Sequence, residues 1–442
     1  MNRPRAAPTD SIARRPRTGP AIARPIGLLL ASLAALASAG MLRAATPGAM
    51  TPPSATPLSA RPLSAQPLSA QPLSARPLSA QGAVGRQLFM DTRLSNPPGT
   101  ACVSCHHPDQ GWGGNNGSIT GVAVGSTPQS AGSRNSPTIG YAGFVPRFHR
   151  VREDGRWVPV GGLFWDGRAD SLSEQARGPL FSRHEMNLSD EADLAGRLRT
   201  APYAESLREA FGLPDDSPDA RWNAAALAAL AAFQRSPEVA PFSSKYDAVR
   251  RGQARFTRAE ARGLRLFSDP AKGNCIACHV FRPGSKNPAD HLFTDFTYDN
   301  LGLPRNPAIV ANAEPAYFDL GLCGPLRERP RGLSDAVCGM FRVPTLRNVA
   351  RRPFYFHNGS FSDLTEVMRF YVRRDTEPAR WYPLDAKGRA QTYNDLPPRF
   401  ARQVSRDEAP YDRRGRQKPR LNEAEIGDVV AFLRTLDDGF EP

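Results

Sequence analysis

Two short motifs with the same spacing carry most of the chemistry that this sequence predicts. Each has two cysteines separated by two residues and followed directly by a histidine, namely Cys102, Cys105 and His106, and then Cys275, Cys278 and His279. Two thiols at this spacing can each bond one vinyl group of the same porphyrin, while the adjacent histidine reaches the iron. The sequence therefore predicts two covalently bound haem c groups, with His106 and His279 as iron ligands.

Three other uses of paired cysteines compete with haem: a four-cysteine zinc site, a thiol redox centre, or simple disulfides. Zinc would not need a histidine after both pairs, and a redox centre would need only one pair, so haem is favoured. The remaining cysteines, Cys323 and Cys338, have no adjacent histidine. In an oxidising compartment we expect them to form a disulfide, and two free thiols are the alternative.

The function of such a haem depends on the second axial position of its iron, because a filled position suits electron transfer and an open one can bind a small oxidant. The sequence stretches that bear on this question are Phe164-Trp165-Asp166-Gly167-Arg168, Gln175, Glu185-Met186, Arg134-Asn135-Ser136-Pro137-Thr138, Pro344-Thr345-Leu346-Arg347-Asn348 and Phe356-His357-Asn358-Gly359. In these stretches and their order, residues 84–436 resemble the bacterial di-haem cytochrome c peroxidase and MauG family.

The resemblance implies a peroxide site at the N-terminal haem, with Gln175 and Glu185 on its distal side. Cleavage of a peroxide needs a group that takes the proton from the near oxygen and returns it to the far one, which Glu185 could do. Gln175 could orient the peroxide by donating a hydrogen bond. Trp165 corresponds to a tryptophan between the haems that can relay an electron. The alternatives are an ordinary surface carboxylate for Glu185 and a core aromatic residue for Trp165.

The resemblance also implies a calcium ion between the haems. Its ligands would be the side chain of Asn135 and the backbone carbonyls near Arg352 and Phe354. Oxygen ligands of this type suit a hard cation. The threonine and proline that the family usually has at the two carbonyl positions are absent here.

Two departures from the family pattern concern the axial ligands. Residues 111–133 contain no histidine, although many members have a distal histidine in this loop, so we expect a five-coordinate or water-bound peroxide haem that needs no prior reduction. At the second haem, Tyr371 stands fourteen residues after His357, where the peroxidases have methionine and the MauG-like branch has tyrosine. Ser362 could cap a helix that carries Tyr371 on its buried face, and Met368 on the same face is the rival ligand.

These features predict a di-haem c-type peroxidase that reduces hydrogen peroxide to water at the N-terminal haem, using electrons relayed through the C-terminal haem. The electrons would come from a small donor protein of the cytochrome c or cupredoxin type. One alternative is a MauG-like enzyme that oxidises side chains of a partner protein through a bis-Fe(IV) state, and another is a non-catalytic di-haem electron carrier. A homodimer is one oligomeric option.

Composition and patterning set the wider frame. The net charge of the 442 residues is +14, of which +6 lies in the first 45, and the other basic residues are scattered, so no nucleic-acid partner is expected. Residues 1–45 have a basic leader and an apolar run, which is typical of a secretory signal peptide and of export to the periplasm; a membrane anchor is the alternative. Residues 46–82 hold five Pro-Leu-Ser-Ala repeats, which predict a disordered linker.

The fold predicted for the rest is all-α: two cytochrome c-like haem domains with long loops. The N-terminal peroxidatic domain would span residues 83–242 and the C-terminal electron-transfer domain residues 243–442. Capping boxes at Thr257 with Glu260 and at Asn422 with Glu425 predict two helices, and residues 193–211 and 224–233 also have helical patterns. No alternating apolar run is long enough for a principal sheet.

Overall fold

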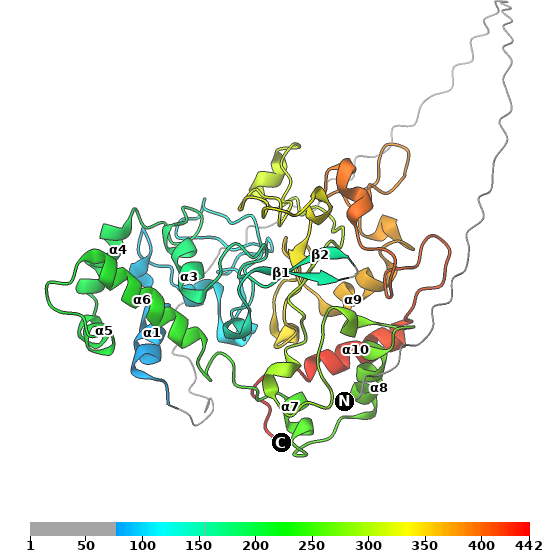
Figure 1. Cartoon of the computed structure of the whole chain (residues 1–442). Helices are drawn as coiled ribbons and strands as arrows, with labels where there is room; N and C mark the ends of the chain where they lie inside the picture. Colours follow the sequence, from blue (N-terminus) through cyan, green and yellow to red (C-terminus); the bar gives the residue numbers. More distant parts are fainter. Residues whose placement is uncertain (1–76, 154) are drawn as a thin grey trace, which may run out of the picture. The chain divides into compact units, whose positions relative to one another are not determined.

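The computed structural model describes residues 77–153 and 155–442 (Figure 1). The predicted signal peptide and nearly all of the repeat segment lie outside the described residues. The first helix, α1 (Ala80–Met90), begins within the fifth repeat, because the hydroxyl of Ser79 accepts a hydrogen bond from the Gly82 amide at 3.1 Å. The folded part thus begins three residues before the predicted domain start at residue 83. Within the described ranges, no helix has both the length and the apolar character that a membrane crossing requires.

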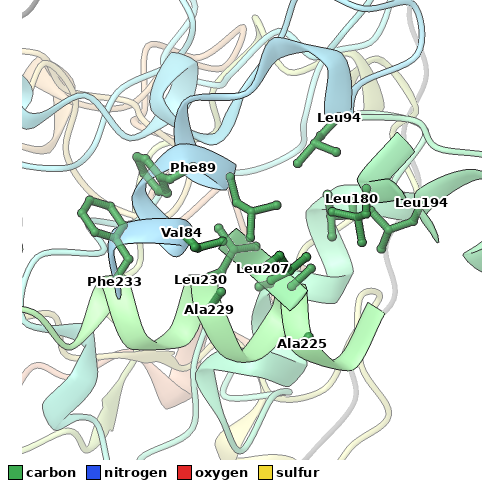
Figure 2. Packing of buried hydrophobic residues seen from close by; sticks show 14 of the residues in the cluster. Val84, Phe89, Leu94, Leu180, Leu194, Leu207, Ala225, Ala229, Leu230 and Phe233 are labelled. Atoms are coloured by element: carbon green, nitrogen blue, oxygen red, sulfur yellow. The ribbon is translucent and has the colours of Figure 1, made fainter. Parts of the chain in front are cut away.

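Helices of the first half pack around one apolar core, part of which is shown in Figure 2. The helices that contribute to this core are α1, α3 (Leu172–Phe181), α4 (Glu191–Arg199), α5 (Ala204–Phe211) and α6 (Asp219–Gln234). α1 and α6 approach so closely that a Cβ on Gly85 would lie 1.9 Å from the carbonyl oxygen of Ala229. The sequence predicted one helix over residues 193–211, but the structure has two helices there, α4 and α5. The predicted helix over residues 224–233 lies inside α6.

Helices of the second half surround a separate core that includes Phe267, Phe293 and Phe432. They are α7 (Lys245–Arg250), α8 (Arg258–Ser268), α9 (Leu364–Arg373) and α10 (Glu423–Arg434). Both predicted capping boxes are confirmed: they begin α8 and α10, with reciprocal hydrogen bonds between the capping residue and the glutamate. The predicted boundary between residues 242 and 243 stays a prediction.

Two small antiparallel sheets amend the all-α prediction. β1 (His149–Glu153) pairs with β2 (Arg156–Val160), and β3 (Tyr298–Asp299) pairs with β4 (Phe341–Arg342). Both are too short to show the alternation of a principal sheet, so the sequence pattern did not reveal them. Helix remains the main regular structure and long loops connect the helices. The predicted disulfide between Cys323 and Cys338 is confirmed.

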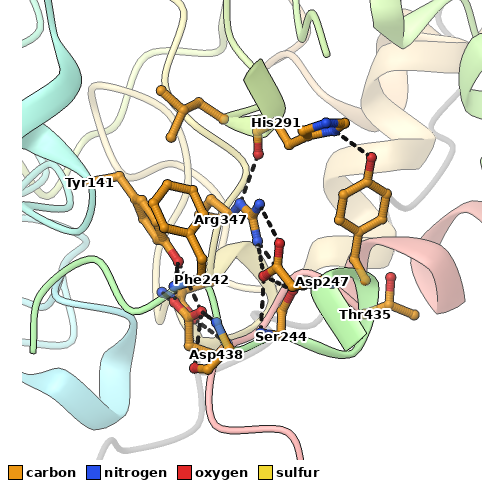
Figure 3. A network of polar contacts seen from close by, with 12 residues as sticks. Tyr141, Phe242, Ser244, Asp247, His291, Arg347, Thr435 and Asp438 are labelled. Carbon is orange, nitrogen blue, oxygen red and sulfur yellow. Dashed lines mark hydrogen bonds and ion pairs between the residues drawn. The ribbon is translucent and has the colours of Figure 1, made fainter. Parts of the chain in front are cut away.

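A buried polar network joins segments that are far apart in the sequence (Figure 3). Arg347, which is 1% exposed, donates to both carboxylate oxygens of Asp247 at 2.6 and 2.9 Å. Beside this pair, Asp438 accepts hydrogen bonds from the Tyr141 hydroxyl at 2.9 Å and from the Asn348 side chain at 2.7 Å. Because a buried charge without a partner is costly, these contacts hold the C-terminal segment against loops of both halves.

Candidate active site and haem-binding residues

Both cysteine and histidine motifs line one connected cavity of about 580 Å³. The first motif begins with the short helix α2 (Cys102–Cys105), and the second begins with a 3-10 turn at Cys275–Ala277. None of these four cysteines forms a disulfide, so the two disulfides that were one alternative to haem are absent from the motifs. The thiols are therefore available for bonds to a group in the cavity.

The two histidines present one ring nitrogen each to that cavity. His106 Nδ1 lies 3.2 Å from the carbonyl oxygen of Trp112, and His279 Nδ1 lies 3.0 Å from that of Phe293. Such a contact fixes the ring and leaves Nε2 free to bind a metal. Burial lowers the pKa of both histidines to about 4, so both rings are neutral, which is the form that binds iron. The donor set and the adjoining cavity fit covalently bound haem.

The residues predicted for peroxide chemistry lie on the wall of the same cavity. Gln175 is in α3, and Glu185 follows this helix in the chain. Both side chains thus line the same cavity as His106, although they are about 70 or more residues away from it in sequence. The charge of Glu185 also acts on the thiols of Cys102 and Cys105. Glu185 is an exposed side chain that lines this cavity, so its role as proton-transfer group stays a prediction beside the alternative of a surface carboxylate.

The backbone around Glu185 is held on both sides. Its amide donates to the carbonyl oxygen of Ser182 at 2.9 Å, and its own carbonyl oxygen accepts from the Ser126 amide at 2.7 Å. The chain at Gly125 passes so close that a Cβ there would lie 2.6 Å from the Glu185 carbonyl oxygen. Only glycine permits this approach, so the position of Glu185 depends on a loop 60 residues earlier.

The surroundings of Glu185 shift the pKa of its carboxyl. The side chain is exposed where it lines the cavity, but the protein atoms around the carboxyl reduce its hydration, which raises its pKa. The positive charge of Arg168 and a hydrogen bond from Ser182 act in the opposite direction. The net shift is upward, so the carboxyl stays protonated to a higher pH than a solvated glutamate does.

Arg168 is a cation of the site that the sequence analysis did not single out. It lines the cavity, lies 3.6 Å from the ring centroid of Phe164, and donates from Nη1 to Asp166 at 2.9 Å. Asp166 is fully buried and also accepts from Arg134 Nη1 at 2.8 Å. In the sequence, Arg168 follows an aspartate by two residues, which is the feature that could have indicated it. Only folding brings its charge close enough to act on Glu185.

Trp165 lies between segments of the two halves. It is 9% exposed, and its indole nitrogen donates to the carbonyl oxygen of Asn135 at 2.7 Å. Its own carbonyl oxygen accepts from the Arg342 amide at 2.8 Å. Trp165 also lines the cavity, so it occupies a position suited to the predicted relay and is at the same time a packed aromatic residue.

The predicted calcium ligands meet only in part. Asn135 Nδ2 donates to the carbonyl oxygens of Phe354 and Phe356 at 3.1 Å each. The Arg352 carbonyl is not joined to Asn135 by a hydrogen bond among the described residues. A cation at this place would require the amide to turn its oxygen toward the carbonyls. No group of three or more His, Cys, Asp or Glu side chains in residues 77–153 and 155–442 could hold a metal, so calcium stays a prediction that depends on neutral oxygens.

The second motif faces α9, which carries both candidate ligands. Tyr371 and Met368 line the cavity, and Met368 is the more enclosed, at 5% exposed. The helix is capped by Asp363, whose carboxylate accepts from the Glu366 amide at 2.8 Å, so the predicted cap at Ser362 was wrong by one residue. The structure records no hydrogen bond between the Tyr371 hydroxyl and a described residue, which leaves this oxygen available to a metal.

Acidic groups beside Tyr371 were not predicted from the sequence. The Tyr411 ring centroid lies 6.4 Å from that of Tyr371, and the Tyr411 hydroxyl is 3.2 Å from Asp299 and 3.1 Å from Glu408. Burial, followed by the charge of Asp299, raises the pKa of Tyr371. Without a metal Tyr371 is thus a neutral phenol, and only a bound cation would favour the phenolate.

Comparison with known proteins agrees with this geometry. The family described as di-haem cytochrome c peroxidase matches residues 79–255. The methylamine utilization protein MauG of Paracoccus denitrificans is 38% identical over 369 residues, 81% of this chain and 89% of that protein. The cytochrome c551 peroxidase of Pseudomonas aeruginosa is 28% identical over 292 residues, 65% of this chain and 70% of that protein. The structure of the diheme peroxidase BthA from Burkholderia thailandensis is 40% identical, with a TM-score of 0.74 over 82% of this chain and 87% of that chain.

Proposed function

The chain belongs to the di-haem cytochrome c peroxidase and MauG family and is a peroxidase-type oxidoreductase, and we propose that its peroxide site lies in the half that carries His106. There hydrogen peroxide is reduced to water, with electrons that pass through the half carrying His279. The observation that carries the proposal is the Glu185 carboxyl, which lines the same cavity as His106 and has a raised pKa. A proton-transfer group in this position serves peroxide cleavage and has no role in a pure electron carrier.

The roles of the side chains follow from their positions. Bound haem would supply the iron that binds peroxide and is oxidised by it. Glu185 accepts a proton from the near oxygen of peroxide and returns it to the far oxygen, which leaves as water. Gln175 donates its amide hydrogen to the peroxide and so orients it. Arg168, held by Asp166, stabilises the ionised form of Glu185 through its charge.

The other predicted residues concern electron transfer and the second haem. Trp165 relays electrons between the halves, which its contacts with Asn135 and Arg342 support. Tyr371 would ligate the iron of a haem held at His279, because its hydroxyl lines the cavity and has no hydrogen-bond partner among the described residues. Met368, which lines the same cavity, is the alternative ligand. A tyrosine ligand favours oxidised iron, so this half is suited to holding an oxidising equivalent.

The setting of the enzyme completes the proposal. The protein is exported to the periplasm, where residues 83–242 and 243–442 form the two haem domains and a calcium ion binds near Asn135. A small cytochrome c or cupredoxin supplies the electrons. The signal-like leader and the two haem motifs support export, since covalent haem attachment and the disulfide both belong outside the cytoplasm.

A resting-state electron paramagnetic resonance spectrum with and without peroxide tests the proposal. We expect one high-spin ferric signal that changes when peroxide is added, together with steady-state peroxide consumption when a small reductant is present. Two low-spin signals that do not respond to peroxide would identify an electron carrier instead and refute the proposed peroxide site.

Oxidation of a partner protein is the second candidate function. The observation that favours it is Tyr371 at the place of the methionine ligand, together with 38% identity to the MauG of Paracoccus denitrificans. In this case peroxide would be consumed slowly with small reductants and rapidly with a protein substrate. Fast steady-state turnover with a small reductant alone favours the peroxidase.

A further inference from the structure

Four arginines line the cavity, and they differ in their counter-charges. Arg134 and Arg168 form ion pairs with Asp166 at 2.8 and 2.9 Å. Arg342 and Arg352 line the same cavity, but neither forms an ion pair with any residue in the described ranges. A guanidinium stays charged at every physiological pH, so two positive charges in this cavity lack a carboxylate partner among the described residues.

The backbone and Nε of Arg342 are held by hydrogen bonds, whereas no described residue holds its terminal guanidinium nitrogens. It belongs to β4, where its amide donates to the Trp165 carbonyl oxygen at 2.8 Å and its Nε donates to that of Phe164 at 3.3 Å. The structure records no hydrogen bond from either terminal nitrogen to a described residue. Burial lowers its pKa, and only Tyr298 opposes this shift, so no carboxylate compensates the charge.

Arg352 is held in a similar way. One terminal nitrogen donates to the carbonyl oxygens of Thr345 at 2.8 Å and Arg347 at 2.7 Å, while its buried Nε has no partner. Burial lowers its pKa to about 10. The charge of Asp437 reaches it only through space, because the two side chains form no ion pair. A buried guanidinium without an ion pair is suited to bind an anion from outside the chain.

The scaffold places both arginines beside the second motif. The residue after Arg342, Val343, is joined to Thr294 and Thr297 by hydrogen bonds of 2.8 Å each, and this segment follows directly on Phe293, which orients His279. Arg352 donates to the Thr345 carbonyl oxygen at 2.8 Å, and the Thr345 hydroxyl donates at 2.5 Å to the carbonyl oxygen of Leu292, the residue before Phe293. The acids near Cys278, Asp299 and Glu408, contact Tyr411 and form no ion pair with either arginine.

We propose that Arg342 and Arg352 bind the propionate groups of the porphyrin attached at Cys275 and Cys278. Propionates are the anionic part of a haem, and guanidinium groups bind carboxylates through short, charge-assisted hydrogen bonds. The proposal depends on covalent haem at the second motif but not on peroxide turnover. A consequence is that the two cations raise the reduction potential of this haem and partly offset the opposite influence of a tyrosine ligand.

Single Arg342→Met and Arg352→Met variants of the full-length holoprotein test the assignment. Arg331→Met is the matched control, because Arg331 is exposed and does not line the cavity. The haem content of each variant is measured first. Resonance Raman spectra then report the propionate bending bands, and a spectroelectrochemical titration without peroxide gives the midpoint potential of each haem.

We expect each methionine variant to shift a propionate band and to lower the midpoint potential of the second haem, with the first haem and the control unchanged. If a methionine variant does not retain its haems, Arg342→Lys and Arg352→Lys keep the charge and should shift the band with a smaller change in potential. Unchanged bands and potentials in haem-loaded variants would overturn the assignment. Because no peroxide is used, a protein inactive toward peroxide could still confirm it.

Discussion

Replacement of Glu185 by glutamine tests the proposed chemistry directly. The Glu185 carboxyl lines the cavity beside His106, and burial raises its pKa. Glutamine has nearly the same size and can still form hydrogen bonds, but it cannot accept the proton of peroxide. Positioned proton-transfer groups contribute about 10²- to 10⁴-fold to a rate, which corresponds to about 3–5 kcal/mol of activation free energy. We therefore expect kcat/KM for hydrogen peroxide to fall by about 100- to 10,000-fold.

The raised pKa of Glu185 also predicts the direction in which kcat/KM changes with pH. A raised pKa means that Glu185 remains protonated to a higher pH than a solvated glutamate, whose pKa is 4.5. Since the ionised form must accept the first proton, kcat/KM should rise with pH through the raised pKa and become constant above it. Arg168→Gln removes a charge that opposes the shift, so the rise should move to higher pH.

Stopped-flow absorption at the Soret band measures the reaction with peroxide over a range of pH. Glu209→Gln serves as the control, because Glu209 is an exposed carboxylate of α5 outside the cavity. The rate in the Glu185→Gln variant should be low, and its pH profile should lack the rise that the ionisation of Glu185 causes. A haem-loaded Glu185→Gln protein with the wild-type rate and the wild-type pH profile would refute the assigned role.

Three further changes have defined outcomes. Tyr371→Phe should alter the absorption and paramagnetic resonance spectra of the second haem while Met368→Leu leaves them unchanged, and the reverse result would make Met368 the ligand. Cys102→Ser combined with Cys105→Ser should remove both thioether bonds at the first motif, so that acid and acetone extract any haem bound there, whereas they extract none from the wild type. Asp247→Asn should lower the free energy of unfolding by about 3–5 kcal/mol in urea denaturation, because it leaves the buried Arg347 charge unpaired; a change below 1 kcal/mol would contradict this.

Features that depend on neighbouring residues could be predicted from the sequence. The capping boxes at Thr257 and Asn422 are confirmed because capping involves residues only three positions apart. The disulfide between Cys323 and Cys338 followed from the absence of a nearby histidine and the small number of cysteines. The haem motifs belong to the same class, since attachment requires adjacent residues in a fixed spacing.

Predictions failed where packing against distant segments decides the local structure. The segment 193–211 has a continuous helical pattern, but it folds as α4 and α5, with a break at residues 200–203. The strands β3 and β4 are two residues each and exist only because segments more than 40 residues apart lie side by side. No periodicity within a window of the sequence can report such a pairing.

The sequence by itself determined the attachment chemistry, because cysteine and histidine at this spacing act as one local unit. The tertiary structure alone decided which groups share a cavity: it places Glu185, Gln175 and His106 on one cavity wall, brings the charge of Arg168 to act on Glu185, and leaves Arg342 without an ion pair to a described carboxylate. The reason is physical. Burial and electrostatic interaction act through space, so the pKa of a carboxyl and the counter-charge of an arginine are set by residues that only folding brings together.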